Sequence, residues 1–471
     1  MYNTLKSVVI ILSKLFGSKK FYKSLCLIVI PIVLQQFITQ FVSLLDNLMI
    51  GQVGDSEMTG VSLANQLLFI FNLSVFGCMA GASIFASQYF GSKNKEGYHE
   101  TIRFKWLMGI FVFISFTLIF IFFNKELISG FITANEGDST NPEIVFESGR
   151  KYLLIMIIGN LPFVIKEIYS TSLREMKETF FPMLSGVIAI FVNLIFNYLL
   201  IFGKFGLPEL GITGAAIATV LSRFVEMILV IVYTHLKKEK FSFFTGVYNK
   251  IFVKWKTFKT FLPISVLLLI NEILWSLGLT LILKSYSIRG LDIVASLNIS
   301  NTITNVFITI GTSLGNATGI IIGNLLGANK IEEAKAGSLH ILTFSVLVTM
   351  IFSLIMIGCA FFVPNLYNAS INIKHTARDL ILIGAIFLPI QSLNTCCYFT
   401  LRAGGKVILT MLFDCVFVCC VRFPIAFVLS KYTNIDIRLV YTATYIVEIL
   451  KSFVGFILVN KGIWLKSLVN E

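Results

Sequence analysis

The sequence predicts an all-α integral membrane protein with twelve transmembrane helices in two parallel, pseudo-symmetric six-helix bundles. The first observation is composition: of 471 residues, 56% are hydrophobic and only 13% are charged. The mean hydropathy of +0.85 lies outside the range of soluble globular proteins. The second observation is that long apolar stretches recur along the whole chain, and the third is an internal repeat between its two halves.

Each apolar stretch is long enough to cross a bilayer as a helix. The hydrocarbon core is about 30 Å thick, so a helix of about 20 apolar residues spans it and pairs its own backbone polar groups. We expect helices over 24–50, 61–83, 104–124, 151–172, 181–203, 211–234, 261–284, 293–322, 339–363, 379–400, 407–430 and 437–460.

The second half of the chain repeats short patterns of the first half in the same order. The repeated features are a proline, a Gly-x-x-x-Gly pair and a short basic stretch: Pro31, Gly77 with Gly81 and FGSKNKE, then Pro263, Gly311 with Gly315 and LGANKIEE. Glycine pairs at this spacing let helix backbones approach closely. Because each half holds an even number of helices, the two bundles are expected to run parallel, related by an axis along the membrane normal.

The positive charges set the predicted orientation and the domain boundaries. Lys and Arg concentrate in alternate loops, so the positive-inside rule favours a plasma-membrane protein with both termini cytoplasmic. The predicted parts are a basic interfacial segment, an N-lobe, a cytoplasmic linker, a C-lobe and a cytoplasmic tail, over 1–23, 24–234, 235–260, 261–460 and 461–471. The net charge of +13 is dispersed over short loops, which favours contact with membrane lipid and argues against nucleic acid.

Two bundles without a soluble domain indicate a transporter that alternates access between its halves. The chain has no G-x-x-x-x-G-K-[ST] phosphate-binding loop, so an ion gradient is the expected energy source, and we expect no enzymatic activity. The eight cysteines lack the spacing of a metal site, and the four histidines lie in or beside loops. We therefore predict no cofactor and no firm metal site, with H⁺ or Na⁺ as the coupling ion.

Ionisable residues inside predicted spans are costly and therefore candidates for function. Asp46 and Glu272 are the leading candidates for ion coupling, because an apolar environment favours the protonated form of a carboxylate. Either carboxylate could instead hydrogen-bond a neighbouring helix, and Asp46 could also lie already in the outer interface of the membrane. Asn193 and Asn197, one helical turn apart, could serve a protonated Asp46 or a cation, with interhelical contact as the alternative.

The remaining intramembrane charges lie close to opposite charges in the sequence and are interpreted as structural ties. The expected local pairs are Lys166 with Glu167, Arg223 with Glu226, Asp414 with Arg422, and Glu448 with Lys451.

Several of these stretches resemble the multidrug and toxic compound extrusion (MATE) family. The resemblance rests on LLDNLMIGQVGDSEMTGVSLANQ, on SQYFGSKN after a GxxxGAS segment, on GITGAAIATVLSR after an N-x-x-x-N helix, and on LINEILWSLG and LRAGGK. It extends from about residue 24 to 455. The resemblance implies a two-bundle antiporter that exports bulky, often cationic or amphipathic compounds in exchange for protons or sodium ions.

The resemblance also implies roles for individual residues. Asp46 matches the family's carboxylate in the first helix, while Asn193, Asn197 and Thr219 match polar positions that surround it in the DinF-type branch. The second of these positions is often Asp there, whereas here it is Asn197. Glu272 resembles the helix-seven glutamate of the NorM-type branch, but the partner Asp of that branch falls at Gln391. Each site is therefore incomplete, and Na⁺ could bind near Asp46 or near Glu272.

The expected substrate is a small molecule, an organic cation or an amphipathic drug, carried by a monomer. The candidates for the substrate cavity are Gln36, Asn65, Trp275, Asn301 and Gln391. The alternative function is a flippase of a lipid-linked saccharide, whose pyrophosphate calls for several arginines in the cavity. The interiors of the predicted spans contain few arginines, namely Arg223 and Arg422, and each has an acidic residue nearby.

Overall fold

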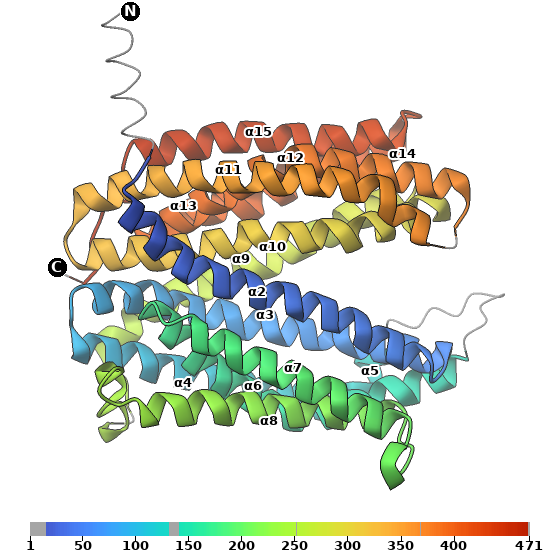
Figure 1. Cartoon of the computed structure of the whole chain (residues 1–471), viewed down its shortest axis with the longest axis horizontal. Coiled ribbons are helices and arrows are strands. Elements are labelled where there is room, and N and C mark those ends of the chain that lie inside the picture. Colours follow the sequence, from blue (N-terminus) through green and yellow to red (C-terminus); the bar gives the residue numbers. More distant parts are fainter. Residues whose placement is uncertain (1–15, 131–140, 251, 368, 470–471) are drawn as a thin grey trace, which may run out of the picture. The chain divides into compact units, whose positions relative to one another are not determined.

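The computed structural model describes residues 16–130, 141–250, 252–367 and 369–469, and every regular element in these ranges is helical (Figure 1). Most of the predicted interfacial segment, residues 1–15, lies outside the described residues.

Twelve helices among the described residues are long and apolar enough to cross a membrane, which confirms the predicted number. Eleven of these spans correspond to one helix each: α2 (Lys19–Gly51), α3 (Asp55–Gly91), α4 (Lys95–Phe122), α6 (Pro142–Glu175), α7 (Phe180–Ile201), α8 (Ile212–Leu236), α9 (Trp255–Ser287), α10 (Leu291–Gly327), α11 (Ile331–Phe362), α12 (Ile371–Ala403) and α15 (Ile437–Asn460).

The remaining span, Val407–Tyr432, is not one regular α-helix as the sequence predicted. It begins as α13 (Val407–Met411), passes through the π-helical stretches η5 (Leu412–Val416) and η6 (Val418–Arg422), and ends as α14 (Phe423–Tyr432). Pro424, near the start of α14, has no N–H to donate to the turn before it, and that turn adopts the wider i→i+5 pattern instead.

The chain packs as two compact units. The C-unit consists of residues up to Val33, Ser87–Asn94 and from Ile270 onward, and the N-unit consists of Leu34–Ala86 and Lys95–Leu269. Helices α2, α3 and α9 are each divided between the units, and α2 changes unit just after Pro31. The lobes 24–234 and 261–460 stay a prediction.

In the N-unit, α6 packs against α4 and α8, and α7 packs against α8. Helix α3 approaches α9 closely through its glycine pair. A Cβ atom on Gly77 would lie 2.8 Å from Leu269 Cα, and one on Gly81 would lie 2.7 Å from the backbone of Ser265. Any larger residue would separate these helices, as the spacing of the pair indicates.

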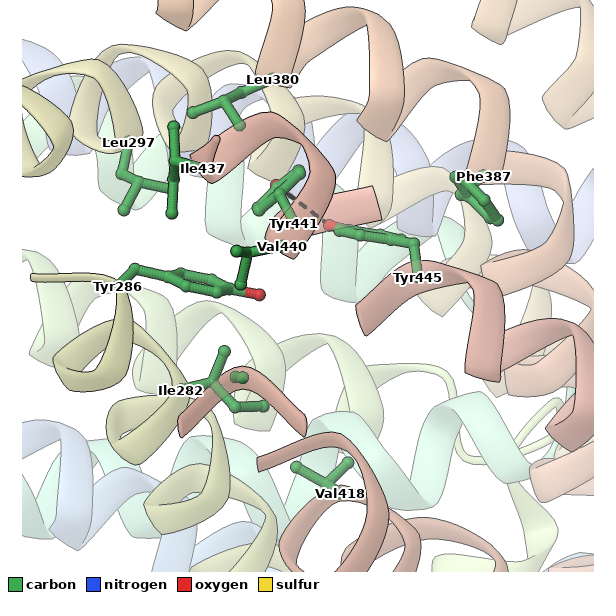
Figure 2. Close-up of a cluster of buried hydrophobic side chains, with 11 residues drawn as sticks. Ile282, Tyr286, Leu297, Leu380, Phe387, Val418, Ile437, Val440, Tyr441 and Tyr445 are labelled. Atoms are coloured by element: carbon green, nitrogen blue, oxygen red, sulfur yellow. Dashed lines mark hydrogen bonds between the residues drawn. The ribbon is translucent and has the colours of Figure 1, made fainter. Parts of the chain in front are cut away.

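In the C-unit, α12 is the central helix and packs against α10, α11 and α15. The buried apolar core of the C-unit, shown in Figure 2, consists of side chains from α9, α10, α12, η6, α14 and α15. Three tyrosines, Tyr286, Tyr441 and Tyr445, belong to this core, and a hydrogen bond of 3.2 Å joins the last two.

The packing repeats within the two units as the sequence repeat does. The contact of α6 with α8 corresponds to that of α12 with α15, and the contact of α4 with α6 corresponds to that of α11 with α12. Both α6 and α12 carry an internal proline, Pro162 and Pro389. The pseudo-symmetry is therefore present in the helix pairs inside each unit.

Candidate functional site

Four of the predicted coupling residues meet in the N-unit. Asp46 lies on α2, Asn193 and Asn197 lie one turn apart on α7, and Thr219 lies on α8. The i, i+4 spacing puts both amides on one face of α7, where the two asparagines are 6% and 1% exposed. The sequence could name these residues, but the packing of three helices is what brings them together.

A chain of hydrogen bonds connects the four side chains. Asn197 Nδ2 donates to Asp46 Oδ1 over 2.7 Å and also lies 3.2 Å from Asn193 Oδ1. Asn193 Nδ2 donates to Thr219 Oγ1 over 3.2 Å. In this arrangement Thr219 donates to the backbone carbonyl of Ala215 over 3.0 Å.

The amide of Asn193 can serve either protonation state of Asp46. With its oxygen toward the carboxyl group, it presents an acceptor to Asp46, which suits a protonated acid. Turned over, its nitrogen donates to Asp46 Oδ1 over 3.0 Å and Oδ2 over 3.1 Å, which suits the carboxylate. The Thr219 hydroxyl then takes the role of donor to Asn193 over 3.2 Å.

The hydrogen-bond partners of Asp46 are neutral amides. The buried Tyr152 on α6 forms a hydrogen bond with Thr219. Among the residues that the structure describes, none donates a hydrogen bond to the buried Oδ1 of Asn197. Side-chain oxygens of Asp46, Asn193 and Thr219 also belong to this cluster, and oxygen is the ligand type that hard cations such as Na⁺ prefer.

Glu272 lies in a different environment, in the C-unit. Its Oε1 is 3.8 Å from Nη1 of Arg402, and the guanidinium also stacks on Tyr398. The Tyr398 hydroxyl accepts from Arg402 over 3.4 Å and from Asn271 over 3.2 Å. Gln391, at the predicted partner position, is half-buried on α12, and its backbone carbonyl accepts from Thr395.

Two of the predicted local ion pairs are wrong, because their members exchange partners between helices. Asp414 pairs with Lys451 over 3.2 Å, and Arg422 lies 3.4 Å from Glu448. Asn394 donates to the other oxygen of Glu448 over 2.9 Å. The short sequence separations suggested pairs within one helix. In the structure, Asp414 on η5 and Arg422 on η6 face α15 and pair with opposite charges on that helix.

The charged groups of α6 and α8 follow the prediction in part. Lys166 pairs with Glu167 over 2.6 Å as expected, and it also lies 3.6 Å from Glu226. Arg223 instead donates to Asn160 Oδ1 over 2.9 Å and to a backbone carbonyl. The predicted pair of Arg223 with Glu226 is therefore replaced by contacts between α8 and α6.

The five candidates for the substrate cavity are distributed over both units. The N-unit contains Gln36 on α2 and Asn65 on α3, while the C-unit contains Trp275 on α9, Asn301 on α10 and Gln391 on α12. Trp275 packs against the C-unit core. Their assignment to one cavity stays a prediction.

Sequence reasoning missed several residues that the structure places beside the candidates. Tyr152, Arg402 and Asn394 had not been singled out as partners. Arg402 was visible in the LRAGGK motif, but its position at the end of a predicted span hid its contact with Glu272. A polar residue such as Asn394 inside an apolar helix was the available signal for the others.

Comparison with known proteins gives two independent likenesses. A family model described as MatE matches the chain twice, over residues 31–199 and 263–428. Both matches begin at the prolines that mark the start of the repeat, so the same sequence pattern occurs once in each half.

Curated relatives and a solved structure cover nearly the whole chain. The "Probable multidrug resistance protein NorM" of Thermotoga maritima is 22% identical over 451 residues, which is 95% of this chain and 94% of the relative. The protein of the same name from Haemophilus ducreyi is 26% identical over 416 residues, 85% of each chain. A solved structure of a MOP superfamily transporter from Pyrococcus furiosus shares the fold with a TM-score of 0.84 at 16% identity, covering 95% of this chain and 96% of that one.

Proposed function

This chain belongs to the MatE family of membrane transporters, and from that premise we propose that it is a cation-coupled antiporter that exports bulky cationic or amphipathic compounds. The substrate class is that suggested by relatives named as multidrug resistance proteins. The transporter is proposed to act as a monomer in the plasma membrane, with both termini cytoplasmic, and to alternate access between two bundles.

The observation that carries this proposal is the environment of Asp46. A carboxylate inside a membrane helix is costly unless its charge is balanced. Asn197 and Asn193 offer it neutral amides, so the local negative charge is left for a mobile cation to neutralise. A proton or a sodium ion bound at Asp46 would supply that neutralisation, and its release to the other side of the membrane would couple the gradient to export.

The same contacts suggest how ion binding changes the protein. When Asp46 is ionised, the amide nitrogens of α7 hold it by charge-assisted hydrogen bonds. Protonation or cation binding weakens this attachment of α2 to α7. Pro31 lacks an N–H and weakens the helix about four turns earlier, so α2 can bend there once it is released.

The test is export of a fluorescent cation such as ethidium from proteoliposomes, under a proton gradient and, separately, under a sodium gradient. We expect one gradient to drive dye out of liposomes that contain the wild-type protein, and that gradient names the coupling ion. Empty liposomes and liposomes that contain the Asp46→Asn variant are the controls.

If neither gradient moves dye in folded protein, the proposed substrate class is wrong for this chain. A lipid-linked saccharide is then the next substrate to test. The two membrane arginines first considered for its pyrophosphate, Arg223 and Arg422, already contact Asn160 and Glu448, which disfavours that alternative.

A further inference from the structure

The segment that joins α8 to α9 forms a second surface of interest. The sequence predicts residues 235–260 as a linker, and the structure folds this segment onto the N-unit. Two short helical turns, η2 (Ser242–Phe244) and η3 (Val247–Asn249), contact α4 and bury Phe244 and Val247. The segment is therefore a docked part of this unit.

A buried ion pair on α4 fixes the segment at two points of its backbone. Arg103 and Glu100 pair over 3.0 Å, and their side chains are 6% and 5% exposed. Arg103 Nε donates to the carbonyl of Val247 over 3.0 Å, and Glu100 accepts from the backbone N–H of Lys254 over 2.8 Å. Lys250, Phe252 and Trp255 are consequently near backbone positions that α4 holds in place.

Two large aromatic side chains point outward next to these anchors. Phe252 is 86% exposed, and Trp255, the first residue of α9, is 66% exposed. The indole ring is stacked on Phe258 with centroids 5.5 Å apart, and the ammonium of Lys259 lies 5.2 Å from its centroid. Exposed aromatic rings of this kind are enriched where a membrane protein meets the lipid headgroups.

Exposed lysines surround the two aromatic residues. We define the linker patch as Phe252 and Trp255 together with Lys250, Lys256 and Lys259, all of which are exposed. We propose that the linker patch binds anionic phospholipid headgroups of the leaflet that it faces. The aromatic rings fit the interfacial layer, and the lysines attract the net negative charge that distinguishes an anionic lipid from a zwitterionic one.

The chemistry of the patch favours lipid over a soluble anion. A binding site for free phosphate would need hydrogen-bond donors that converge on one point. The patch instead has ammonium groups on separate side chains beside aromatic rings, on a segment whose backbone is bound by Glu100 and Arg103. This arrangement is suited to a charged surface that also accepts aromatic side chains.

The experiment measures quenching of Trp255 fluorescence by brominated lipids in nanodiscs. Wild-type protein is compared with Trp255→Phe, so that the difference isolates Trp255 from the other three tryptophans. One set of nanodiscs carries brominated phosphatidylglycerol with ordinary phosphatidylcholine, and the other carries the bromine on phosphatidylcholine at the same lipid ratio and the same mole fraction of bromine. We expect brominated phosphatidylglycerol to quench Trp255 at least about twice as strongly.

Two triple variants test whether the patch itself is responsible. Lys250→Gln, Lys256→Gln and Lys259→Gln together should bring quenching by the two lipids to parity. The control triple, Lys19→Gln, Lys20→Gln and Lys23→Gln at the exposed start of α2, removes the same charge and should keep the preference.

Three outcomes would overturn the proposal: equal quenching of wild type by both lipids, no quenching by either lipid, or an equal loss of preference in both triples. Because the readout is fluorescence, it does not depend on whether the chain exports a dye.

Discussion

Three partly buried carboxylates, Asp46 in the N-unit and Asp414 and Glu272 in the C-unit, have different electrostatic surroundings. In the N-unit, Asp46 accepts from the neutral amide of Asn197 over 2.7 Å. In the C-unit, Asp414 meets the ammonium of Lys451 over 3.2 Å, and Glu272 lies 3.8 Å from the guanidinium of Arg402. The two C-unit carboxylates therefore have a fixed cation beside them, as Glu167 and Glu100 do in the N-unit, whereas Asp46 accepts from a neutral amide.

This difference indicates which carboxylate is suited to exchange ions. A carboxylate beside a fixed cation forms a neutral pair, so adding a proton or Na⁺ leaves an uncompensated positive charge in a medium of low dielectric constant. A carboxylate surrounded by neutral amides carries an uncompensated negative charge, and a bound proton or Na⁺ neutralises that charge. We therefore propose Asp46 as the principal coupling group, while Glu272 stays a predicted second candidate.

The largest effect is expected from Asp46→Asn. The variant keeps the shape of the side chain but removes its charge, so it should bind substrate and lose gradient-driven dye export down to the level of empty liposomes. Export assays in proteoliposomes and dye binding in detergent measure the two properties separately. Normal export by a well-folded variant would remove Asp46 from the mechanism.

The next largest effect is expected on stability, from Lys451→Met. This change leaves the partly buried Asp414 without its cation and should cost about 3 kcal/mol of unfolding free energy. The double variant Asp414→Asn with Lys451→Met should recover most of the loss. Thermal unfolding in detergent checks both, and a double variant as unstable as the single one would show that the pair does not act as a neutral unit.

A smaller effect is expected from Asn193→Ala. The variant removes one hydrogen-bonding amide next to Asp46 but leaves the carboxyl group in place. Because this amide donates to the ionised carboxylate, its loss should strengthen the apparent affinity of Asp46 for a proton about tenfold, the usual value of a hydrogen bond to a charged group. The measurement is export rate against ion concentration, and an unchanged half-saturation would argue against a role for this amide.

The smallest effect on ion coupling is expected from Glu272→Gln. Because Arg402 already balances Glu272, the dependence of export on sodium or protons should change by less than about twofold. A specific loss of sodium dependence in this variant would contradict the comparison and make Glu272 a second coupling group.

The sequence predicted the helices well because the length and hydrophobicity of a span are local properties of the chain. The number of spans was correct, and the family model matches each half from the repeated proline onward. The π-helical stretches were missed because wide turns are made of the same apolar residues as ordinary ones. Pro424 was the one local sign of them.

The sequence by itself determined the membrane fold, the twofold repeat and the identity of Asp46, Asn193, Asn197 and Thr219 as candidates. It did not determine which charges meet. Asp414 and Arg422 pair across to α15, because helix packing and the hydrogen-bonding register of η5 and η6 decide which faces turn toward each other. The charge of a side chain can be read from one residue. Whether an opposite charge lies close enough to compensate it depends on the distance between two helices, which only the tertiary structure sets.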